Sequence, residues 1–298
     1  NNDADPPNIT ITPKNDLSKD TVYAINYPPG AFTQSGAGGS FVGTAYTFSS
    51  VPINNELYTW GDGAYGLLGV NNTPVNRSSP TQVGSDINWL NICQGYGHDN
   101  TFNVATKFDG TLWMWGNNAN GALGQNDRTL RSSPIQVGSD TTWNKVTSGA
   151  YGAMATKTDG TLWTWGGGNS GGVLGLNDRA SRSSPTQIPG TTWTGDIGCG
   201  QQHAMAIKTN GTLWTWGRGG FGELGQNDTT NKSSPVQVPG TTWSKLAQGS
   251  GYHGAAIKTD GTLWTWGWND VSIIKDNRLF LNVDENSLKF YFLHFYYF

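Results

Sequence analysis

An eight-residue segment recurs along the chain with little change, and this repetition narrows the folds open to the sequence more than any other feature. The copies read DGTLWMWG, DGTLWTWG, NGTLWTWG and DGTLWTWG. They begin at Asp109, Asp159, Asn210 and Asp260, and a looser copy, NELYTWG, begins at Asn55. The spacing is close to ~50 residues, and a fixed period of that length is typical of blade or solenoid arrays.

The sequence between the copies predicts short strands. TTWSKLAQG and GAAIKT have the length and side chains of two strands, and TLWTWG returns antiparallel after the DG pair. Asp-Gly suits a two-residue type I′ turn, because both central residues of that turn need a positive φ. PVQVP predicts a fourth strand at an edge, where proline is tolerated. Four antiparallel strands per unit predict the blade of a β-propeller, and hence an all-β fold.

Side chains alternate faces along the TLWTWG strand, so its two tryptophans point the same way. A propeller blade is packed between two neighbours, and a wide aromatic face suits that packing. We therefore interpret the second tryptophan of each copy as inter-blade packing and the glycine of each DG pair as a turn residue. These repeat positions are Trp60, Trp115, Trp165, Trp216 and Trp266, with Gly110, Gly160, Gly211 and Gly261.

The composition argues against several classes of function. Only 13% of the 298 residues are charged and the net charge is −3, so no electrostatic attraction to nucleic acid is expected. No apolar run reaches the ~18 residues of a membrane span. The two cysteines, Cys93 and Cys199, stand two repeats apart and in no metal-binding spacing, and we expect both to be buried free thiols.

The polar residues suggest no catalytic set, metal site or cofactor site, and we expect no enzymatic activity. His98, His203 and His253 occur one per unit, which predicts bonds to the backbone rather than a triad. No glycine-rich loop leads into a helix that could bind phosphate. The Asn-Asp pairs could hold calcium, but such pairs more often close an Asx turn. They are Asn126-Asp127, Asn177-Asp178 and Asn227-Asp228.

Basic residues recur at two positions of the unit. A propeller turns each position into an arc, which could collect anionic ligands. Asp109, Asp159 and Asp260 stand two residues from lysines of the first set and would offset them, so solvated surface charge is the simpler interpretation. The two sets are Lys107, Lys157, Lys208 and Lys258, and Arg77, Arg131, Arg182 and Lys232.

The repeated residues resemble the regulator of chromosome condensation repeat. In that family a Trp-Gly strand is followed by GxxxGxLG, by a strand that contains proline, and by a Gly-to-His segment before the next hairpin. TWGDGAYGLLG, WGNNANGALG, WGGGNSGGVLG and WGRGGFGELG carry the first part, and CGQQHAMAIKTNG carries the last. The resemblance covers residues 54–268. It implies a seven-bladed propeller, and at ~50 residues per blade this chain holds about four blades.

The two ends of the chain depart from the repeat. Residues 1–53 resemble the second half of a bacterial Ig-like domain, through ITITPKNDLSKDTVYAINYPPGAF, a glycine-rich turn and a closing YTF. Residues 269–298 contain no glycine and end in an aromatic run. A truncated gene or a shifted reading frame would give such a tail, and an atypical capping segment is the alternative.

The copies agree at the scaffold Gly, Leu and Trp positions but differ inside the loop after each Trp-Gly pair. A constant frame with variable tips is typical of binding surfaces, although neutral drift at exposed tips explains the variation equally well. The variable residues are our candidate ligand contacts: Asp62, Tyr65, Asn117, Asn120, Asn169, Arg218 and Phe221.

We expect a non-enzymatic recognition or adhesion module of a larger bacterial surface, secreted or phage virion protein, which binds a protein or a cell-surface glycan. The extracellular, cell-surface or virion location is inferred from the Ig-like half, the Thr-, Asn- and Gly-rich composition and the near-identical copies. The family name suggests guanine-nucleotide exchange on a small GTPase as an alternative. Inhibition of a protein such as a β-lactamase is another, because β-lactamase-inhibiting propellers share the superfamily that the repeat resembles and the fold alone does not decide between functions.

Overall fold

The computed structural model describes residues 22–25, 46–49, 55–72, 74–95, 101–193, 195–247, 251–268, 281–284 and 287–290. The chain divides into two compact units, Asn1–Asn54 and Asn55–Phe298. In the first unit, β1 (Val22–Ile25) pairs antiparallel with β2 (Tyr46–Ser49). The rest of the predicted Ig-like half-domain lies outside the described residues.

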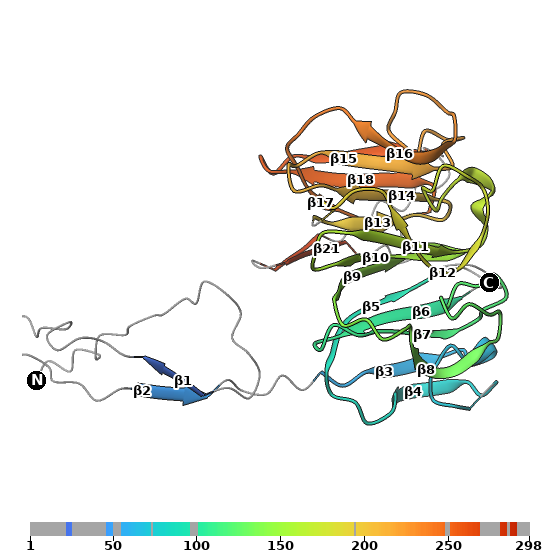
Figure 1. Cartoon of the computed structure of the whole chain (residues 1–298), viewed down its shortest axis with the longest axis vertical. Coiled ribbons are helices and arrows are strands. Elements are labelled where there is room, and N and C mark those ends of the chain that lie inside the picture. The colour runs from blue at the N-terminus through green and yellow to red at the C-terminus, as the bar shows by residue number, and fades with distance from the viewer. Residues whose placement is uncertain are drawn as a thin grey trace, which may run out of the picture. The chain divides into compact units, whose positions relative to one another are not determined.

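The second unit is an array of antiparallel sheets, three of which have the four strands of a complete propeller blade (Figure 1). A two-stranded sheet precedes these blades and a three-stranded sheet follows them. The fold is therefore all-β and agrees with the predicted partial propeller. The sheets comprise β3 (Tyr58–Gly61) and β4 (Arg77–Gln82); β5 (Trp89–Gln94), β6 (Phe102–Lys107), β7 (Leu112–Gly116) and β8 (Arg131–Gln136); β9 (Trp143–Ser148), β10 (Gly152–Lys157), β11 (Leu162–Gly166) and β12 (Arg182–Ile188); β13 (Ile197–Cys199), β14 (His203–Ile207), β15 (Leu213–Gly217) and β16 (Lys232–Val238); and β17 (Trp243–Leu246), β18 (His253–Lys258) and β19 (Leu263–Gly267).

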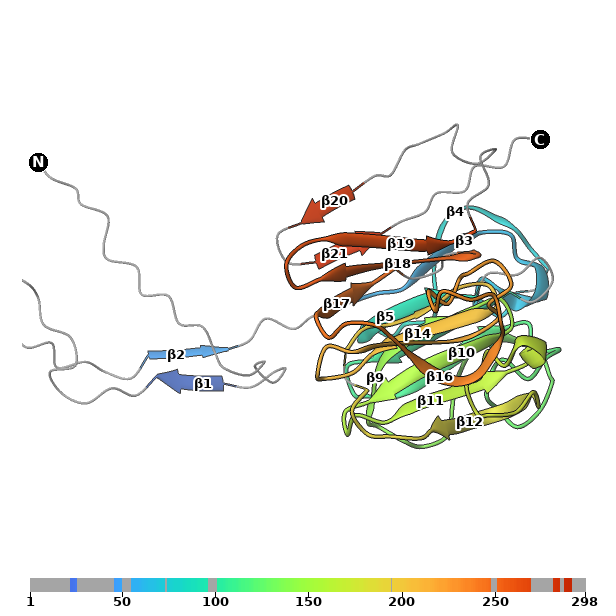
Figure 2. The ribbon, with the colours of Figure 1, turned by 90° about the horizontal axis from the view of Figure 1, so that it is seen from above.

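The first strands of successive blades lie on the inner side of the array, where β5 contacts β9 and β9 contacts β13. Each complete blade then continues outward through its strands in chain order. Figure 2 shows β17, β18 and β19 side by side in the last sheet. This up-and-down order brings loops of the same kind to the same end of every blade.

In each complete blade the Trp-Gly pair that ends the third strand forms a β-bulge. The register of β7 with β8 shifts between Met114 and Gly116, and that of β11 with β12 shifts between Thr164 and Gly166. The φ of Gly166 is 114°, and a Cβ there would lie 2.4 Å from the Cα of Gly152. Only glycine fits this position, because a side chain would meet backbone and the φ is unfavourable for other residues.

The second tryptophan of each copy joins its blade to the preceding one. The Trp165 side chain is fully buried, and its Nε1 donates a 2.9 Å hydrogen bond to the Ala122 carbonyl. Gly124 packs on the same indole, since a Cβ there would lie 3.1 Å from Nε1. Equivalent bonds run from Trp115 to Leu67, from Trp216 to Val173 and from Trp266 to Glu223.

Trp60 differs from the other copies, because its side chain is 64% exposed. The sheet formed by β3 and β4 has no described blade before it, so no described carbonyl or glycine receives the indole on that side. The packing role predicted for Trp60 is therefore not seen among the described residues.

The DG hairpins differ from the predicted two-residue turn. The Lys107 N–H donates to the Thr111 carbonyl and the Gly110 N–H to the Lys107 carbonyl, which leaves three residues in the loop. Gly110 has a φ of 77°, whereas Asp109 is not among the residues with positive φ. The loop is thus a type I turn followed by a left-handed glycine. The Asp109 carboxylate holds the turn by accepting from the N–H and Oγ1 of Thr111.

The C-terminal segment contributes one described hairpin, in which β20 (Leu281–Asp284) pairs antiparallel with β21 (Ser287–Phe290). The remainder of the predicted atypical tail, residues 269–298, lies outside the described residues. In the part of the chain that is described, no helix has the length and apolar character needed to cross a bilayer.

Candidate functional site

The glycine-rich loops gather at one end of the blades. Each follows a third strand, and the second strand begins opposite that point, since His203 pairs with Gly217 and His253 with Gly267. The loops between first and second strands therefore share this end. We call it the loop rim; of the described residues it comprises 62–72, 74–76, 117–130, 167–181 and 218–231, with 149–151, 200–202 and 251–252 before β10, β14 and β18.

Two of the predicted ligand contacts, Asn117 and Asn169, are buried inside the rim. Asn169 is 3% exposed; its Nδ2 donates to the Ala180 carbonyl, and its Oδ1 accepts from the Leu174 N–H. Asn117 is 8% exposed, and its Oδ1 accepts from the Ala119 N–H. Both side chains shape their own loops, so neither presents a surface to a ligand. Sequence variation at these positions was a poor guide because it does not report burial.

Three other predicted contacts stand on the first two loops of the rim. The exposed Asp62 carboxylate accepts from the Ala64 N–H, so it also stabilises its own loop. The Tyr65 side chain is 43% exposed, and its backbone has a φ of 54°. Asn120 is partly buried, and a Cβ at Gly167 of the next loop would lie 2.6 Å from its Cβ.

The remaining two predicted contacts, Arg218 and Phe221, belong to an aromatic cluster that joins the sheets β13–β16 and β17–β19. The Phe221 ring stacks on Trp268, with centroids 5.3 Å apart, and meets Tyr252 edge-on at 5.4 Å. The Arg218 guanidinium lies 4.8 Å from the Phe221 centroid and 5.4 Å from that of Tyr252. Phe221 is 39% exposed and Trp268 is 42% exposed. We call Arg218, Phe221, Tyr252 and Trp268 the rim cluster.

A buried carboxylate holds the loop beneath the rim cluster. Glu223 is 1% exposed, and its Oε2 accepts a 2.6 Å hydrogen bond from the Phe221 N–H. Its Oε1 lies 4.0 Å from the Arg218 Nε, and its backbone carbonyl accepts from Trp266. The carboxylate thereby fixes the Phe221 backbone and the carbonyl joins the loop to the next sheet, so the exposed rings are displayed on a fixed support.

Tyr252 and Trp268 are rim residues that the sequence interpretation missed. Trp268 follows the fifth Trp-Gly pair and so occupies the repeat position of Arg218 and Asn117. Extending the comparison of variable positions to that last pair would have found it. Tyr252 stands where Gln202 stands in the preceding unit, and it had no sequence signal beyond that difference.

The histidine and cysteine predictions are partly wrong. His203 is fully buried, and neither ring nitrogen has a hydrogen-bond partner, so the expected bond to backbone is absent there. Burial lowers the pKa of His203 to about 4, and nearby His253 adds to this effect. Both cysteines are free, but only Cys199 is buried, and burial raises the pKa of its thiol to about 12. His98 lies outside the described residues.

The Asn-Asp pairs form Asx turns. Asn126, Asn177 and Asn227 have φ values of 59°, 61° and 57°. The following aspartates accept backbone N–H bonds two residues on, as Asp127 does from Thr129. Hydrogen bonding to Thr129, and then to Arg131, holds the pKa of Asp127 below its usual value. Within the described residues, no group of three or more His, Cys, Asp or Glu side chains could hold a metal ion.

Family models and individual proteins both match the blade array. The model described as the regulator of chromosome condensation (RCC1) repeat matches residues 54–98, 109–156, 159–207 and 210–257. A second model of the same repeat matches residues 196–223 and 243–272.

Several curated proteins are similar to the chain over the same region. The ultraviolet-B receptor UVR8 of Arabidopsis thaliana is 31% identical over 182 residues, which are 59% of this chain and 40% of UVR8. The probable E3 ubiquitin-protein ligase HERC3 of Homo sapiens is 28% identical over 178 residues, 57% of this chain and 16% of HERC3. The chain thus spans less than half the length of either relative.

Solved structures show the same fold. Human WBSCR16 aligns with a TM-score of 0.58 and 24% identity over 74% of this chain and 55% of that one. Yeast RCC1 (Prp20), in a crystal structure with Kap60, aligns with a TM-score of 0.59 and 18% identity over 80% of this chain and 58% of that one.

Proposed function

Because the chain belongs to the family of proteins built from regulator of chromosome condensation (RCC1) repeats, we propose that it is a non-enzymatic module that binds a protein partner through its loop rim. The rim cluster is the observation that carries this proposal. Arg, Tyr and Trp are the residues most enriched at the energetic centres of protein interfaces, and here they surround a stacked and exposed phenylalanine. The side chains are held in place before binding, which lowers the entropy cost of association.

Comparison among the repeats supports a role for the rim cluster beyond folding. The position of Phe221 is occupied by Asn120 in the second unit, and that of Arg218 by Gly167 in the third. Those units form complete blades without aromatic residues there. The fold therefore does not need the cluster. Among the similar structures, one is described as Kap60 bound to yeast RCC1 (Prp20), so a protein that shares this fold has a protein partner in that case.

We extend the proposal to an extracellular, cell-surface or virion setting, in which the chain serves recognition or adhesion. The Thr-, Asn- and Gly-rich composition supports this setting, as does the resemblance of residues 1–53 to an Ig-like half-domain. A glycan is the other ligand class for an exposed aromatic surface, and guanine-nucleotide exchange is the activity that the family name suggests. The experiment that follows distinguishes glycan binding and nucleotide exchange from the binding of a protein partner.

The test compares the wild-type chain with a Phe221→Ala/Trp268→Ala variant. Partners captured from the native source would be purified and remeasured one at a time by biolayer interferometry. We expect the double variant to weaken the binding of a true partner by about tenfold or more, the loss typical of interface centres.

The matched control is Phe108→Thr, because Phe108 is a 40% exposed aromatic in a DG hairpin, at the opposite end of the blades. Other units have Thr158 and Thr259 at this position, so the change should leave folding and binding intact. Equal binding by wild type and double variant would contradict the proposal. Binding of a glycan array alone, or nucleotide release from a small GTPase, would replace it with the corresponding alternative.

A further inference from the structure

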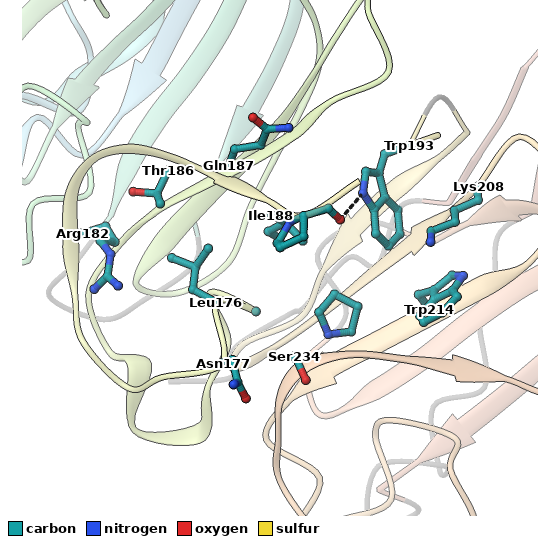
Figure 3. A pocket seen from close by; sticks show the side chains of 13 residues that line it. Leu176, Asn177, Arg182, Thr186, Gln187, Ile188, Trp193, Lys208, Trp214 and Ser234 are labelled. Atoms are coloured by element: carbon teal, nitrogen blue, oxygen red, sulfur yellow. Dashed lines mark hydrogen bonds between the residues drawn. The ribbon is translucent and has the colours of Figure 1, made fainter. Parts of the chain in front are cut away.

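A cavity of about 450 Å³ lies between the blade β9–β12 and the blade β13–β16, on residues outside the rim cluster (Figure 3). Its volume falls within the range of small-molecule sites, which is roughly 300–1,000 Å³. Two cationic side chains, Arg182 and Lys208, contribute to the lining, and none of the described lining residues is acidic. Its apolar walls are formed by Leu176, Ile188, Pro189, Trp193, Trp214 and Pro235.

Lys208 lacks the acidic partner that its counterparts have in earlier blades. The Lys107 Nζ lies 2.9 Å from the Asp86 carboxylate, and Lys157 forms the same ion pair with Asp140. Within the described residues, Lys208 forms no ion pair. Its ammonium lies 4.5 Å from the Trp193 ring centroid and 4.1 Å from that of Trp214. The ion-paired Lys157 lies over its two indoles in the same way, so the missing carboxylate is what distinguishes Lys208.

The loss of the partner follows from a shorter linker between blades. The sequence VGSDTTW leads into Trp143 and contains Asp140, whereas IPGTTW leads into Trp193 with one residue fewer and no acid. Gly190 at this linker has a φ of 110°, and the Trp193 Nε1 donates to the Pro189 carbonyl. The shortened linker therefore removes the carboxylate that neutralises the lysine in the other complete blades.

Of the two cations that line the cavity, Lys208 is the one without an acidic partner among the described residues. The Arg182 guanidinium is already paired with the Asp178 carboxylate. Figure 3 shows Arg182 and Lys208 at opposite ends of the lining, with the Lys208 amine between the two indoles. Partial burial lowers the pKa of Lys208, because the ammonium has lost solvent without gaining a counter-charge.

The remaining copy, Lys258, lacks both the linker acid and the enclosing wall. Its linker reads VPGTTW, again without aspartate, but the sheet β17–β19 has three described strands rather than four. Ser234 and Pro235, which close the Lys208 cavity from β16, therefore have no described counterpart there. Among the described blades, the combination of an unneutralised lysine and a complete enclosing blade occurs at Lys208.

We propose that this cavity binds a small organic carboxylate with an apolar body. The carboxylate pairs with the Lys208 ammonium, in the place that Asp140 takes beside Lys157. The apolar body lies against Leu176, Ile188 and Pro235. A hydrogen-bonded ion pair in a partly desolvated site adds affinity beyond the apolar contact. The same chemistry is offered by a free aryl carboxylate and by a peptide that ends in an apolar residue.

The test measures binding of 3-phenylpropionate to the full chain by saturation-transfer NMR and isothermal titration calorimetry. The uncharged analogue 3-phenylpropionamide is the ligand control. A short peptide ending in Phe with a free carboxylate, beside its amidated form, distinguishes the peptide source from the free acid. We expect each acid to bind at least about tenfold more tightly than its amide, as the loss of a charged hydrogen bond implies.

Three variants locate the binding. Lys208→Met should weaken the binding of 3-phenylpropionate to the level of its amide. Lys157→Met should leave the Kd of 3-phenylpropionate unchanged, because Lys157 is already paired with Asp140. Replacing Pro189-Gly190 by Gly-Ser-Asp restores the linker of the preceding blade and should abolish binding with Lys208 intact. Circular dichroism checks that each variant is folded. Equal affinity of acid and amide, or full binding by both the Lys208→Met and the linker variants, would overturn the proposal.

Carboxylate binding in the Lys208 cavity should not depend on the rim cluster. Phe221→Ala/Trp268→Ala should leave the Kd for 3-phenylpropionate unchanged, because neither residue lines the cavity. Loss of carboxylate binding in that variant would contradict the assignment to the Lys208 cavity.

Discussion

Trp165 and Trp60 occupy the same position of the same motif, yet they lie in opposite environments. The Trp165 side chain is fully buried and donates to the carbonyl of Ala122, in the preceding blade. The Trp60 side chain is 64% exposed. Because the local sequence is TWG in both cases, the difference arises from the neighbouring sheet and not from the strand itself.

This difference shows that the motif stabilises pairs of blades. The tryptophan of one unit, and the glycine and carbonyl of the GxLG segment before it, act together as one contact. Stability in such an array is approximately a sum of unit terms and nearest-neighbour terms. We call this contact the seam between two blades. Changes at a seam should therefore cost far more free energy of unfolding than the same changes at Trp60 in the first sheet.

The largest effect is expected for Trp165→Ala. Removing a fully buried tryptophan should lower the free energy of unfolding by about 3–5 kcal/mol, through lost burial and the cavity left behind. Urea denaturation followed by circular dichroism measures this change. The same substitution at Trp60 should cost within about 0.5 kcal/mol, as for exposed sites. Similar losses of unfolding free energy at the two positions would contradict the claim that the neighbouring blade makes the tryptophan stabilising.

The glycine side of the seam should show the next largest effect. Gly175 has a φ of 70°, and a Cβ there would lie 2.7 Å from the Trp216 Nε1. Gly175→Ala should cost about 2–4 kcal/mol, from backbone strain together with the displaced indole. Gly138→Ala is the control, because Gly138 has a φ of 62° but a Cβ there would meet nothing within 4 Å.

The thermal unfolding midpoints of the two glycine variants separate the clash from the strain. Gly138→Ala should lose only the strain term, of about 1 kcal/mol. An equal loss in both variants would mean that the contact with Trp216 contributes nothing, which would contradict the proposed seam.

The smallest effect concerns the Asp140–Lys157 pair. The hydrogen bond from Lys157, and then that from Thr142, lowers the pKa of Asp140 to about 2. A lowered carboxyl pKa adds stability above the unfolded value near 3.8, and this stability is lost as the pH falls toward 2. The Asp140 side chain is 37% exposed, so screening limits the effect to below about 1 kcal/mol. Between pH 4 and 2 the free energy of unfolding should therefore fall by less in Asp140→Asn than in the wild type, and the difference should be below about 1 kcal/mol.

The seams could be predicted from the sequence because the period, the Trp-Gly pairs and the GxLG segments repeat. The strand count per unit follows from the turn pair and the edge prolines, and the packing role of Trp115, Trp165 and Trp216 follows from alternation along a strand. The turn type at Asp109 could not be predicted, since the carboxylate bonds to Thr111 and leaves the positive φ to Gly110 alone.

The rim was harder to predict, because variation among copies does not report burial. It selected Arg218 and Phe221, which are partly exposed, but also Asn169, which is buried and holds its own loop. Tyr252 joins the cluster only through the packing of two sheets. The ion-pair partners of the lysine arcs were likewise missed: Asp86 and Asp140, which pair with Lys107 and Lys157, come from the linkers between blades.

Hydrogen–deuterium exchange of the wild-type chain tests most directly the claim that neighbouring blades supply the stability of each motif. The ladder between β3 and β4 and the ladder between β11 and β12 join equivalent strands with equivalent bulges. The account predicts that amides of the β11–β12 ladder exchange at least about a hundredfold more slowly than those of the β3–β4 ladder, since that blade has a seam on both sides. Equal protection of the two ladders would contradict it.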